Sequence, residues 1–236
     1  MRARKSIAVY CALAALVLCG GALGVVGGTT DTGHPYVVAA FGPHELCSGA
    51  LVSSTVVVTA AHCYSGTLDG DTVQITLAPV VHPAGEFVAT GPTYPGKIHR
   101  LEDHDIAVVV LDTGIQLDHY ADLPASTGLV EKLPSNQRVD VVGFGISAIK
   151  SGLPTAFGTK QLTTSNLASA GVLSGEFVKV VTGPCQGDSG APNLLTGTNT
   201  VLAITTYSNG NPNCNGDSYS ERLDTEAAEA FFRSYR

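Results

Sequence analysis

The chain is poor in charged residues, because only 14% of its 236 residues are Asp, Glu, Lys or Arg, whereas 44% are hydrophobic. So little charge excludes a disordered chain and predicts a compact protein with a sizeable core. Basic residues are fewer than acidic residues, with 13 Lys and Arg against 20 Asp and Glu, which gives a net charge of −7. Without a positive field to attract phosphates, we expect no nucleic-acid partner.

Metal-binding patterns of the Cys-x-x-Cys and His-Glu-x-x-His kinds are also missing. We therefore expect no metal site and no cofactor. The segment Asp69-Gly70-Asp71 is a weak acidic cluster that more often forms a turn, and it leaves calcium binding open.

The amino end has the pattern of a secretory signal peptide. Three basic residues, Arg2, Arg4 and Lys5, precede an apolar run from Ile7 to Leu18, and small residues follow. The run is shorter than the ~20 residues that a membrane-spanning helix needs. We therefore predict a signal peptide over residues 1–24, whose removal takes the net charge from −7 to −10 and leaves a secreted protein with no membrane attachment.

Four cysteines remain after this segment: Cys47, Cys63, Cys185 and Cys214. They allow three pairings. Pairing 47 with 63 and 185 with 214 closes two local loops, each worth roughly 3 kcal/mol of loop entropy, and we expect these two disulfides.

Short runs rich in Val and Thr, separated by Gly, Pro, Asn and Asp, predict an all-β fold. The expected strands are 36–41, 49–60, 72–77, 106–111, 138–144, 177–182 and 201–207. One terminal helix is expected, capped by Asp224, with Ala227, Phe231 and Tyr235 on one stripe. The weakly patterned segment 121–134 would link two halves, about 25–125 and 126–236.

The sharpest chemical feature is Ser189, which stands between glycines in Gly187-Asp188-Ser189-Gly190. Glycines allow a tight turn whose N–H groups point at one spot, and a serine nucleophile needs a base. No histidine follows Ser189. The chain order therefore excludes the α/β-hydrolases and GDS-type esterases, which place their histidine after the serine.

Among the earlier histidines, His62 follows an apolar strand and adjoins Cys63, so a disulfide would hold it rigidly. Asp105 opens the apolar run 105–111, where a buried carboxylate needs a donor such as an imidazole N–H. Asp103 is the rival carboxylate. We favour Asp105 because it adjoins the apolar run, and we expect Asp103 and His104 to face solvent.

These residues resemble the trypsin/chymotrypsin-like serine protease family. Six segments carry the resemblance, in the family's order: Val25-Val26-Gly27-Gly28, Cys47-Ser48-Gly49-Ala50-Leu51, Thr59-Ala60-Ala61-His62-Cys63, Asp105-Ile106-Ala107, Gly143-Phe144-Gly145 and Cys185-Gln186-Gly187-Asp188-Ser189-Gly190. The resemblance implies one protease domain over residues 25–236, built from two packed antiparallel six-stranded β-barrels and a C-terminal helix.

By the same resemblance, Ser189 is the nucleophile, His62 the general base and Asp105 the residue that orients His62. The N–H groups of Gly187 and Ser189 would form the oxyanion hole. Cleavage after Gly24 would free the ammonium of Val25 to pair with Asp188, so that export itself would mature the protein.

The substrate pocket departs from the usual pattern. Gly183 stands where trypsins that prefer Arg or Lys carry an aspartate, whereas Asp217 aligns with a second pocket-lining position. Three further residues, Thr206, Tyr207 and Ser208, replace the usual Ser-Trp-Gly strand. Thr206 puts in doubt the hydroxyl that normally supports the catalytic aspartate. The P1 side chain, which precedes the scissile bond, would be basic or broad through Asp217, and otherwise apolar.

The resemblance predicts a secreted, monomeric serine endopeptidase that acts on polypeptides and meets protein protease inhibitors. The alternative is a catalytically silent, protease-like binding protein, because a fold does not guarantee its function. Such proteins usually lose a member of the triad, and this chain keeps all three.

Overall fold

The computed structural model describes residues 28–82, 88–150, 153–167, 175–181, 183–209, 214 and 216–236. The predicted signal peptide and Val25 lie outside these residues. None of the helices in the described part combines the length and the hydrophobicity that a membrane-spanning helix requires.

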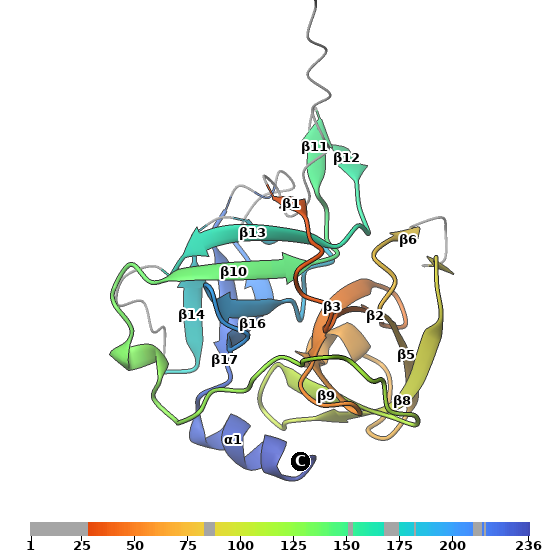
Figure 1. The fold of residues 1–236 in the computed structure, drawn as a ribbon, viewed down its shortest axis with the longest axis horizontal. Coiled ribbons are helices and arrows are strands. Elements are labelled where there is room, and N and C mark those ends of the chain that lie inside the picture. Colours follow the sequence, from red (N-terminus) through yellow and green to blue (C-terminus); the bar gives the residue numbers. More distant parts are fainter. Residues whose placement is uncertain are drawn as a thin grey trace, which may run out of the picture.

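The first half is a closed six-stranded barrel (Figure 1). Its strands follow the order β2-β3-β4-β9-β8-β5, and every neighbouring pair is antiparallel. The bounds are β2 Val37–Phe41, β3 Leu46–Leu51, β4 Val56–Ala60, β5 Thr72–Thr76, β8 Thr93–Arg100 and β9 Ile106–Leu111. All residues of β4 are buried, because this valine-rich strand lies between β3 and β9 with its inward face in the barrel core. A short hairpin, β6 Val81–His82 and β7 Val88–Ala89, stands beside the barrel.

The second half is a seven-stranded sheet in the order β1-β13-β10-β15-β16-β17-β14. The bounds are β1 Thr29–Thr30, β10 Arg138–Gly143, β13 Gln161–Asn166, β14 Phe177–Val180, β15 Pro192–Leu195, β16 Val201–Ser208 and β17 Ser218–Arg222. A single bridge between Leu167 and Val180 links the ends of β13 and β14, so these six strands form a second barrel that one bridge closes, and β1 pairs with the remaining edge of β13. A hairpin, β11 Ala148–Lys150 and β12 Leu153–Ala156, projects from this half.

The predicted all-β fold with a terminal helix is confirmed. The expected run 49–60 is wrong as one strand, because β3 and β4 are separate strands joined by a turn. In that turn the Ser53 hydroxyl accepts hydrogen bonds from the N–H groups of Thr55 and Val56. The hydroxyl satisfies the backbone where the chain reverses.

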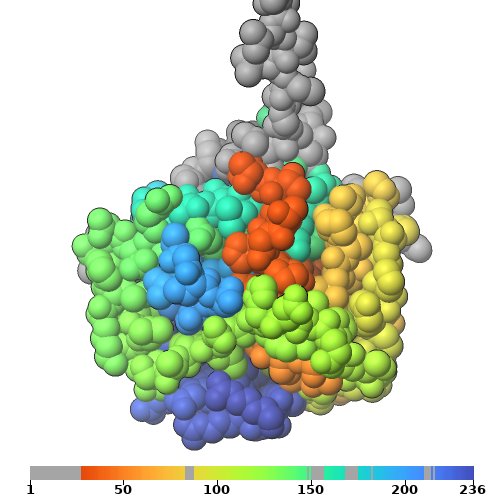
Figure 2. Space-filling view, in the orientation of Figure 1, coloured from red at the N-terminus to blue at the C-terminus, as the bar shows by residue number. Residues whose placement is uncertain are grey.

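Two connections tie the halves together. The start of the described chain, drawn in red in Figure 2, belongs to the second sheet through β1 before the chain enters the first barrel. The segment from β9 to β10 crosses back, with the Ala121 N–H donating to Leu51 O (2.9 Å) and the Asp122 N–H to Asn199 O (2.9 Å). It contains one turn of 3₁₀ helix, Val130–Lys132.

Helix α1, Glu226–Arg233, ends the chain. Its N-cap is Thr225, whose hydroxyl accepts from the Ala228 N–H, so the expected cap at Asp224 is wrong. The Asp224 carboxylate is buried and accepts instead from Arg222 (2.8 Å) and from the Val130 N–H (2.7 Å). The buried stripe is also displaced by one position, to Ala228 and Phe232, while Ala227, Phe231 and Tyr235 are half-buried beside it.

Candidate active site

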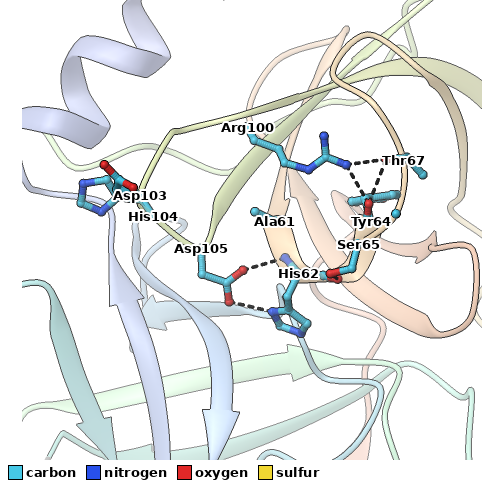
Figure 3. Close-up of a pocket in the computed structure, with 10 residues that line it drawn as sticks. Ala61, His62, Tyr64, Ser65, Thr67, Arg100, Asp103, His104 and Asp105 are labelled. Atoms are coloured by element: carbon cyan, nitrogen blue, oxygen red, sulfur yellow. Dashed lines mark hydrogen bonds and ion pairs between the residues drawn. The ribbon is translucent and has the colours of Figure 1, made fainter.

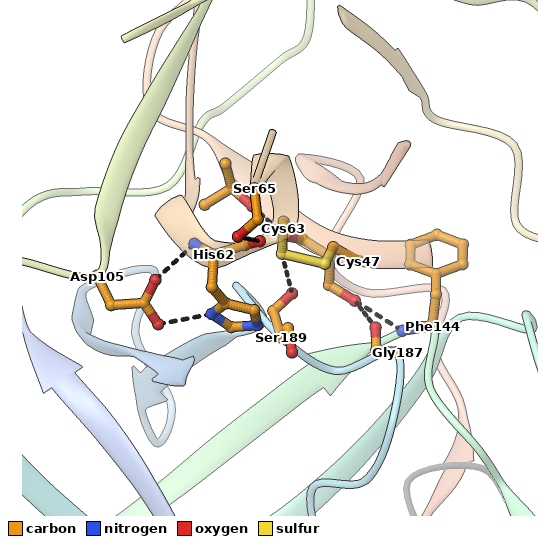
Figure 4. Close-up of a disulfide and its surroundings, with 10 residues drawn as sticks. Cys47, His62, Cys63, Ser65, Asp105, Phe144, Gly187 and Ser189 are labelled. Carbon is orange, nitrogen blue, oxygen red and sulfur yellow. Dashed lines mark hydrogen bonds and ion pairs between the residues drawn. A yellow bond between two sulfur atoms is a disulfide. The ribbon is translucent and has the colours of Figure 1, made fainter. Parts of the chain in front are cut away.

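His62 lies where the first barrel meets the second half. Strand β4 ends at Ala60 and a 3₁₀ turn, Ala61–Tyr64, follows at once and turns the His62 side chain out of the barrel. Cys63 in this turn is joined to Cys47 of β3, with an S–S distance of 2.06 Å (Figure 4). The turn is therefore fastened to a second strand of the barrel.

The Asp105 carboxylate holds His62 at two points. One oxygen accepts from the His62 backbone N–H at 2.7 Å, and the other lies 2.7 Å from imidazole Nδ1 (Figure 3). This contact follows from strand pairing, because β4 and β9 are neighbours and Ala60 lies opposite Ile106, the residue after Asp105. Asp103 is exposed, with a φ of 62°, and within the described residues it makes no hydrogen bond or ion pair with His62. The geometry therefore brings Asp105, and not the rival carboxylate, to the imidazole.

The neighbours of His62 favour its protonated form. Burial alone would lower the pKa of His62, because it removes water from the imidazolium. The hydrogen bond and negative charge of Asp105 outweigh this effect, and the pKa of His62 is raised. An imidazole in this setting can take a proton from a nearby hydroxyl and stabilise the charge that results.

Ser189 stands in a tight loop that is fixed to both halves. Its carbonyl accepts from the Ser48 N–H of β3 at 2.8 Å, and the next N–H, of Gly190, donates to Thr205 O at 2.7 Å. Gly190 has a φ of +78°, and a Cβ there would lie 2.3 Å from Ser48 O, so only glycine fits. Figure 4 shows Ser189 next to the imidazole edge of His62 that faces away from Asp105.

Several polar groups of this loop are unpaired. Within the described residues, the Ser189 hydroxyl makes no hydrogen bond, and the N–H groups of Gly187 and Ser189 have no acceptor. Free N–H groups beside a serine are what an oxyanion hole requires. Catalytic hydrogen bonds are often long before substrate binds, so a free hydroxyl is compatible with a nucleophile.

Ser48 is a site-supporting residue that our sequence analysis missed. It is fully buried, and its hydroxyl donates to Gly187 O (3.0 Å) and accepts from the Phe144 N–H (3.0 Å). It thereby joins the His62 half to the loop of Ser189. The available signal was its place in the segment Cys47-Ser48-Gly49, but nothing in that pattern shows what the hydroxyl contacts.

Asp188 is fully buried under this loop. Its carboxylate accepts from the N–H groups of Gly145 and Cys185, at 2.9 Å each. A Cβ at Gly145 would lie 2.5 Å from the carboxylate, so a glycine leaves the room that Asp188 needs. Burial raises the pKa of Asp188 to about 7, although both N–H groups oppose the shift. Its expected partner, the Val25 ammonium, lies outside the described residues.

The predicted pocket residues come from two segments of the second half. Gly183 precedes the Ser189 loop, whereas the others lie at the end of β16 or just before β17. Gly183 is buried, with a φ of 119°. Tyr207 is half exposed and stacks on Tyr219 with ring centroids 4.8 Å apart, and Ser208 Oγ donates to Asp217 O at 3.1 Å. The Asp217 carboxylate lies 2.9 Å from Lys179 Nζ, so its charge is already paired. The Thr206 hydroxyl contacts Ile204 O and, within the described residues, does not support Asp105.

A cavity of about 600 Å³ opens beside His62 and Asp105. It is lined by Ala61, His62, Tyr64, Ser65, Gly66, Thr67, Arg100, Asp103, His104 and Asp105 (Figure 3). His104 does not face solvent as expected, because its Nδ1 lies 2.7 Å from the buried carboxylate of Glu221 and its side chain is 17% exposed. No local sequence pattern predicts this contact, because His104 and Glu221 are 117 residues apart.

The candidate metal ligands are engaged in other bonds. Donor atoms of Cys47, His62 and Cys63 lie within 4.8 Å of one another, but both sulfurs belong to the disulfide and cannot act as thiolates. Asp69 accepts from His99 and from the Arg100 N–H, and Asp71 accepts from the Leu68 N–H. The second disulfide joins Cys185 to Cys214 near the Ser189 loop.

Comparisons with known proteins identify the family of the chain. The sequence profile of the family described as Trypsin matches residues 25–222. Trypsin of Phaedon cochleariae is 27% identical over 184 residues, which cover 65% of this chain and 66% of that protein. Trypsin-3 of Salmo salar is 29% identical, covering 65% and 69%. Cationic trypsin-3 of Rattus norvegicus is 28% identical, covering 73% and 75%.

Among solved structures, HL collagenase has the same fold, with a TM-score of 0.70, 19% identity and coverage of 89% of this chain and 98% of that one. The family profile extends over both barrels and includes every residue of the candidate site. The chain therefore belongs to the trypsin family of serine proteases.

Proposed function

We propose that this protein is a secreted serine endopeptidase that cleaves polypeptides through Ser189, His62 and Asp105. The two-point contact of Asp105 with His62 carries the proposal, because it fixes both the ring orientation and the tautomer. With Nδ1–H donated to Asp105, Nε2 is free to accept the proton of Ser189. The alternative tautomer would place a proton on Nε2, which then could not accept the proton of Ser189.

In the proposed reaction, Ser189 Oγ attacks the scissile carbonyl while His62 takes its proton. The oxyanion forms beside the free N–H groups of Gly187 and Ser189. His62 then gives the proton to the leaving amine, which departs from an acyl-enzyme, and water repeats the sequence to release the acid. Loss of one oxyanion donor typically costs ~3 kcal/mol of barrier.

For the P1 side chain we propose an uncharged preference. Gly183 brings no charge to the pocket floor, and the Asp217 carboxylate is paired with Lys179 at 2.9 Å. A carboxylate that already binds an ammonium offers little net field to a second cation. The basic preference that Asp217 would provide by alignment is therefore disfavoured.

The test is labelling of the mature protein with a fluorophosphonate, which modifies an activated serine, followed by a peptide library with varied P1 residues. We expect labelling that Ser189→Ala abolishes, and cleavage after uncharged side chains. Ser234→Ala, an exposed serine after α1, is the matched control and should label normally. A folded, correctly matured protein that neither labels nor cleaves would instead support the silent binding protein.

A further inference from the structure

A second carboxylate–imidazole pair lies behind Asp105. One oxygen of Glu221 lies 2.7 Å from His104 Nδ1, and the other accepts from the Asp105 backbone N–H at 2.7 Å. This repeats the contact that Asp105 makes with His62, where one carboxylate also spans a backbone N–H and an imidazole. The two pairs are in series, linked through Asp105 itself.

Glu221 is an unusual residue for its position. It lies on β17 between β16 and β14, and its cross-strand neighbours are Ile204 and Phe177. Its side chain is only 2% exposed. A carboxylate so buried is costly unless it is paired, which indicates that its charge has a role beyond packing.

The charged groups around Glu221 are few. His104 and Asp105 face it from the loop before β9, and His62 lies beyond Asp105. The next residue on β17, Arg222, turns to Asp224 and Glu131 instead. Asp103 is exposed on the same loop as His104. Among the described residues, His104 is therefore the only basic side chain in contact with the Glu221 carboxylate.

We propose that Glu221 and His104 form an imidazolium–carboxylate pair that positions Asp105 and sets the pH at which His62 loses its proton. This inference rests on the proposed function. Glu221 and His104 are positioning residues, because they act through Asp105 and do not touch the reacting atoms. Within the described part of the chain, the Thr206 hydroxyl does not contact Asp105, whereas Glu221 accepts a hydrogen bond from the Asp105 backbone.

The two charges should act on His62 in opposite directions. The negative charge of Glu221 stabilises the imidazolium of His62 and raises its pKa, whereas the positive charge of His104 offsets this effect. Burial raises the pKa of Glu221 and the hydrogen bond from His104 opposes that shift, so the proton balance of the pair depends on both residues.

The experiment measures the His62 pKa by NMR titration of its ring proton in the mature protein, together with the acid limb of kcat/KM. Glu221→Gln keeps an acceptor for the Asp105 N–H but removes the negative charge. We expect the His62 midpoint to fall by about 0.5 unit or more. His104→Gln keeps a donor and removes the positive charge, and should raise the midpoint by a similar amount. The double variant should return it toward the original value.

Glu229→Gln on α1 and His99→Gln on β8 are matched controls that remove one acid and one histidine outside the network. A merely structural role would change unfolding temperature without opposite midpoint shifts. Unchanged midpoints, or shifts of one sign in both single variants, would overturn the inference. NMR reads His62 whether or not peptides are cleaved, so failure of this inference is distinguishable from failure of the proposed function. If Glu221→Gln does not fold, His104→Gln alone decides the outcome by the sign of its shift.

Discussion

Lys179 is the residue on which the proposed P1 preference depends most directly. Its ammonium lies 2.9 Å from Asp217 Oδ2 at a partly exposed site, and this contact raises the pKa of Lys179. The pair links β14 to the residue just before β17. Without the lysine, that charge would be free to attract a cation.

We therefore predict that Lys179→Met raises kcat/KM for substrates with Arg at P1 about 3- to 10-fold relative to substrates with Leu, because it frees one carboxylate near the pocket. Parallel peptide substrates at low salt give the measurement, since salt screens a half-exposed charge. Lys132→Met, which removes an exposed lysine in the connecting segment, should leave the ratio unchanged. An equal ratio in the Lys179 variant would mean that Asp217 does not face the substrate.

Ser48 shows where sequence reasoning ends at this scale. Its segment contributed to recognition of the family, yet three of its hydrogen bonds join residues almost a hundred positions apart or more. The same holds for Glu221, whose partner His104 is 117 residues away. Local pattern identifies groups with intrinsic chemistry, such as Ser189 and His62. It does not identify buried groups whose role depends on what the fold places against them.

At the scale of elements, apolar runs were predicted well and polar strands were missed. Strands β4 and β9 are valine-rich, and both fall within expected ranges. Strands β13 and β17, with the sequences QLTTSN and SYSER, lack an apolar period and form because both of their neighbours supply hydrogen-bond partners. The helix was placed correctly, but Asp224 and Thr225 are adjacent cap candidates. The Asp224 carboxylate binds Arg222 and is therefore not available to cap the helix.

The position of the helix cap has a measurable consequence. With Thr225 as the cap, Phe232 is 3% exposed in the core, whereas Phe231 is half-buried. We predict that Phe232→Ala lowers the free energy of unfolding by roughly 3–5 kcal/mol, and that Phe231→Ala lowers it by clearly less. Urea unfolding of both variants, made on Ser189→Ala to prevent self-cleavage, gives the comparison. A larger loss for Phe231→Ala would indicate the stripe expected from the sequence, and equal losses would contradict the prediction.

At the scale of the whole molecule, the proposed active site exists only where the two barrels meet. His62 and Asp105 come from the first barrel and Ser189 from the second, and hydrogen bonds of Ser48 connect the two barrels. Helix α1 belongs to this arrangement too, because Ala228 and Phe232 pack in the same hydrophobic core as the first barrel. The start of the described chain is fastened to the second half, where Thr29 and Thr30 of β1 pair with β13. In the sequence, Val25 precedes Thr29 by four residues.

The ionisation of Asp188 provides a test of the proposed maturation by cleavage after Gly24. In a chain that retains Leu23 and Gly24, no Val25 ammonium exists, and the raised Asp188 pKa of about 7 means that the folded state holds a proton which the unfolded state releases near 3.8. Stability from this group is therefore full below pH 4 and is lost as the pH rises to 7, by about 4 kcal/mol. A chain that begins at Val25 can keep Asp188 ionised as an ion pair, and should escape that loss.

The measurement is urea unfolding at pH 5 and pH 7.5 for both chains, each carrying Ser189→Ala. We expect the extended chain to lose stability between these pH values relative to the chain that begins at Val25. Asp188→Asn removes the titrating group and should erase the difference between the chains. N-terminal sequencing of the exported, active protein should then begin at Val25. The same pH dependence in both chains would show that the new terminus does not reach Asp188, and that maturation forms the oxyanion loop in another way.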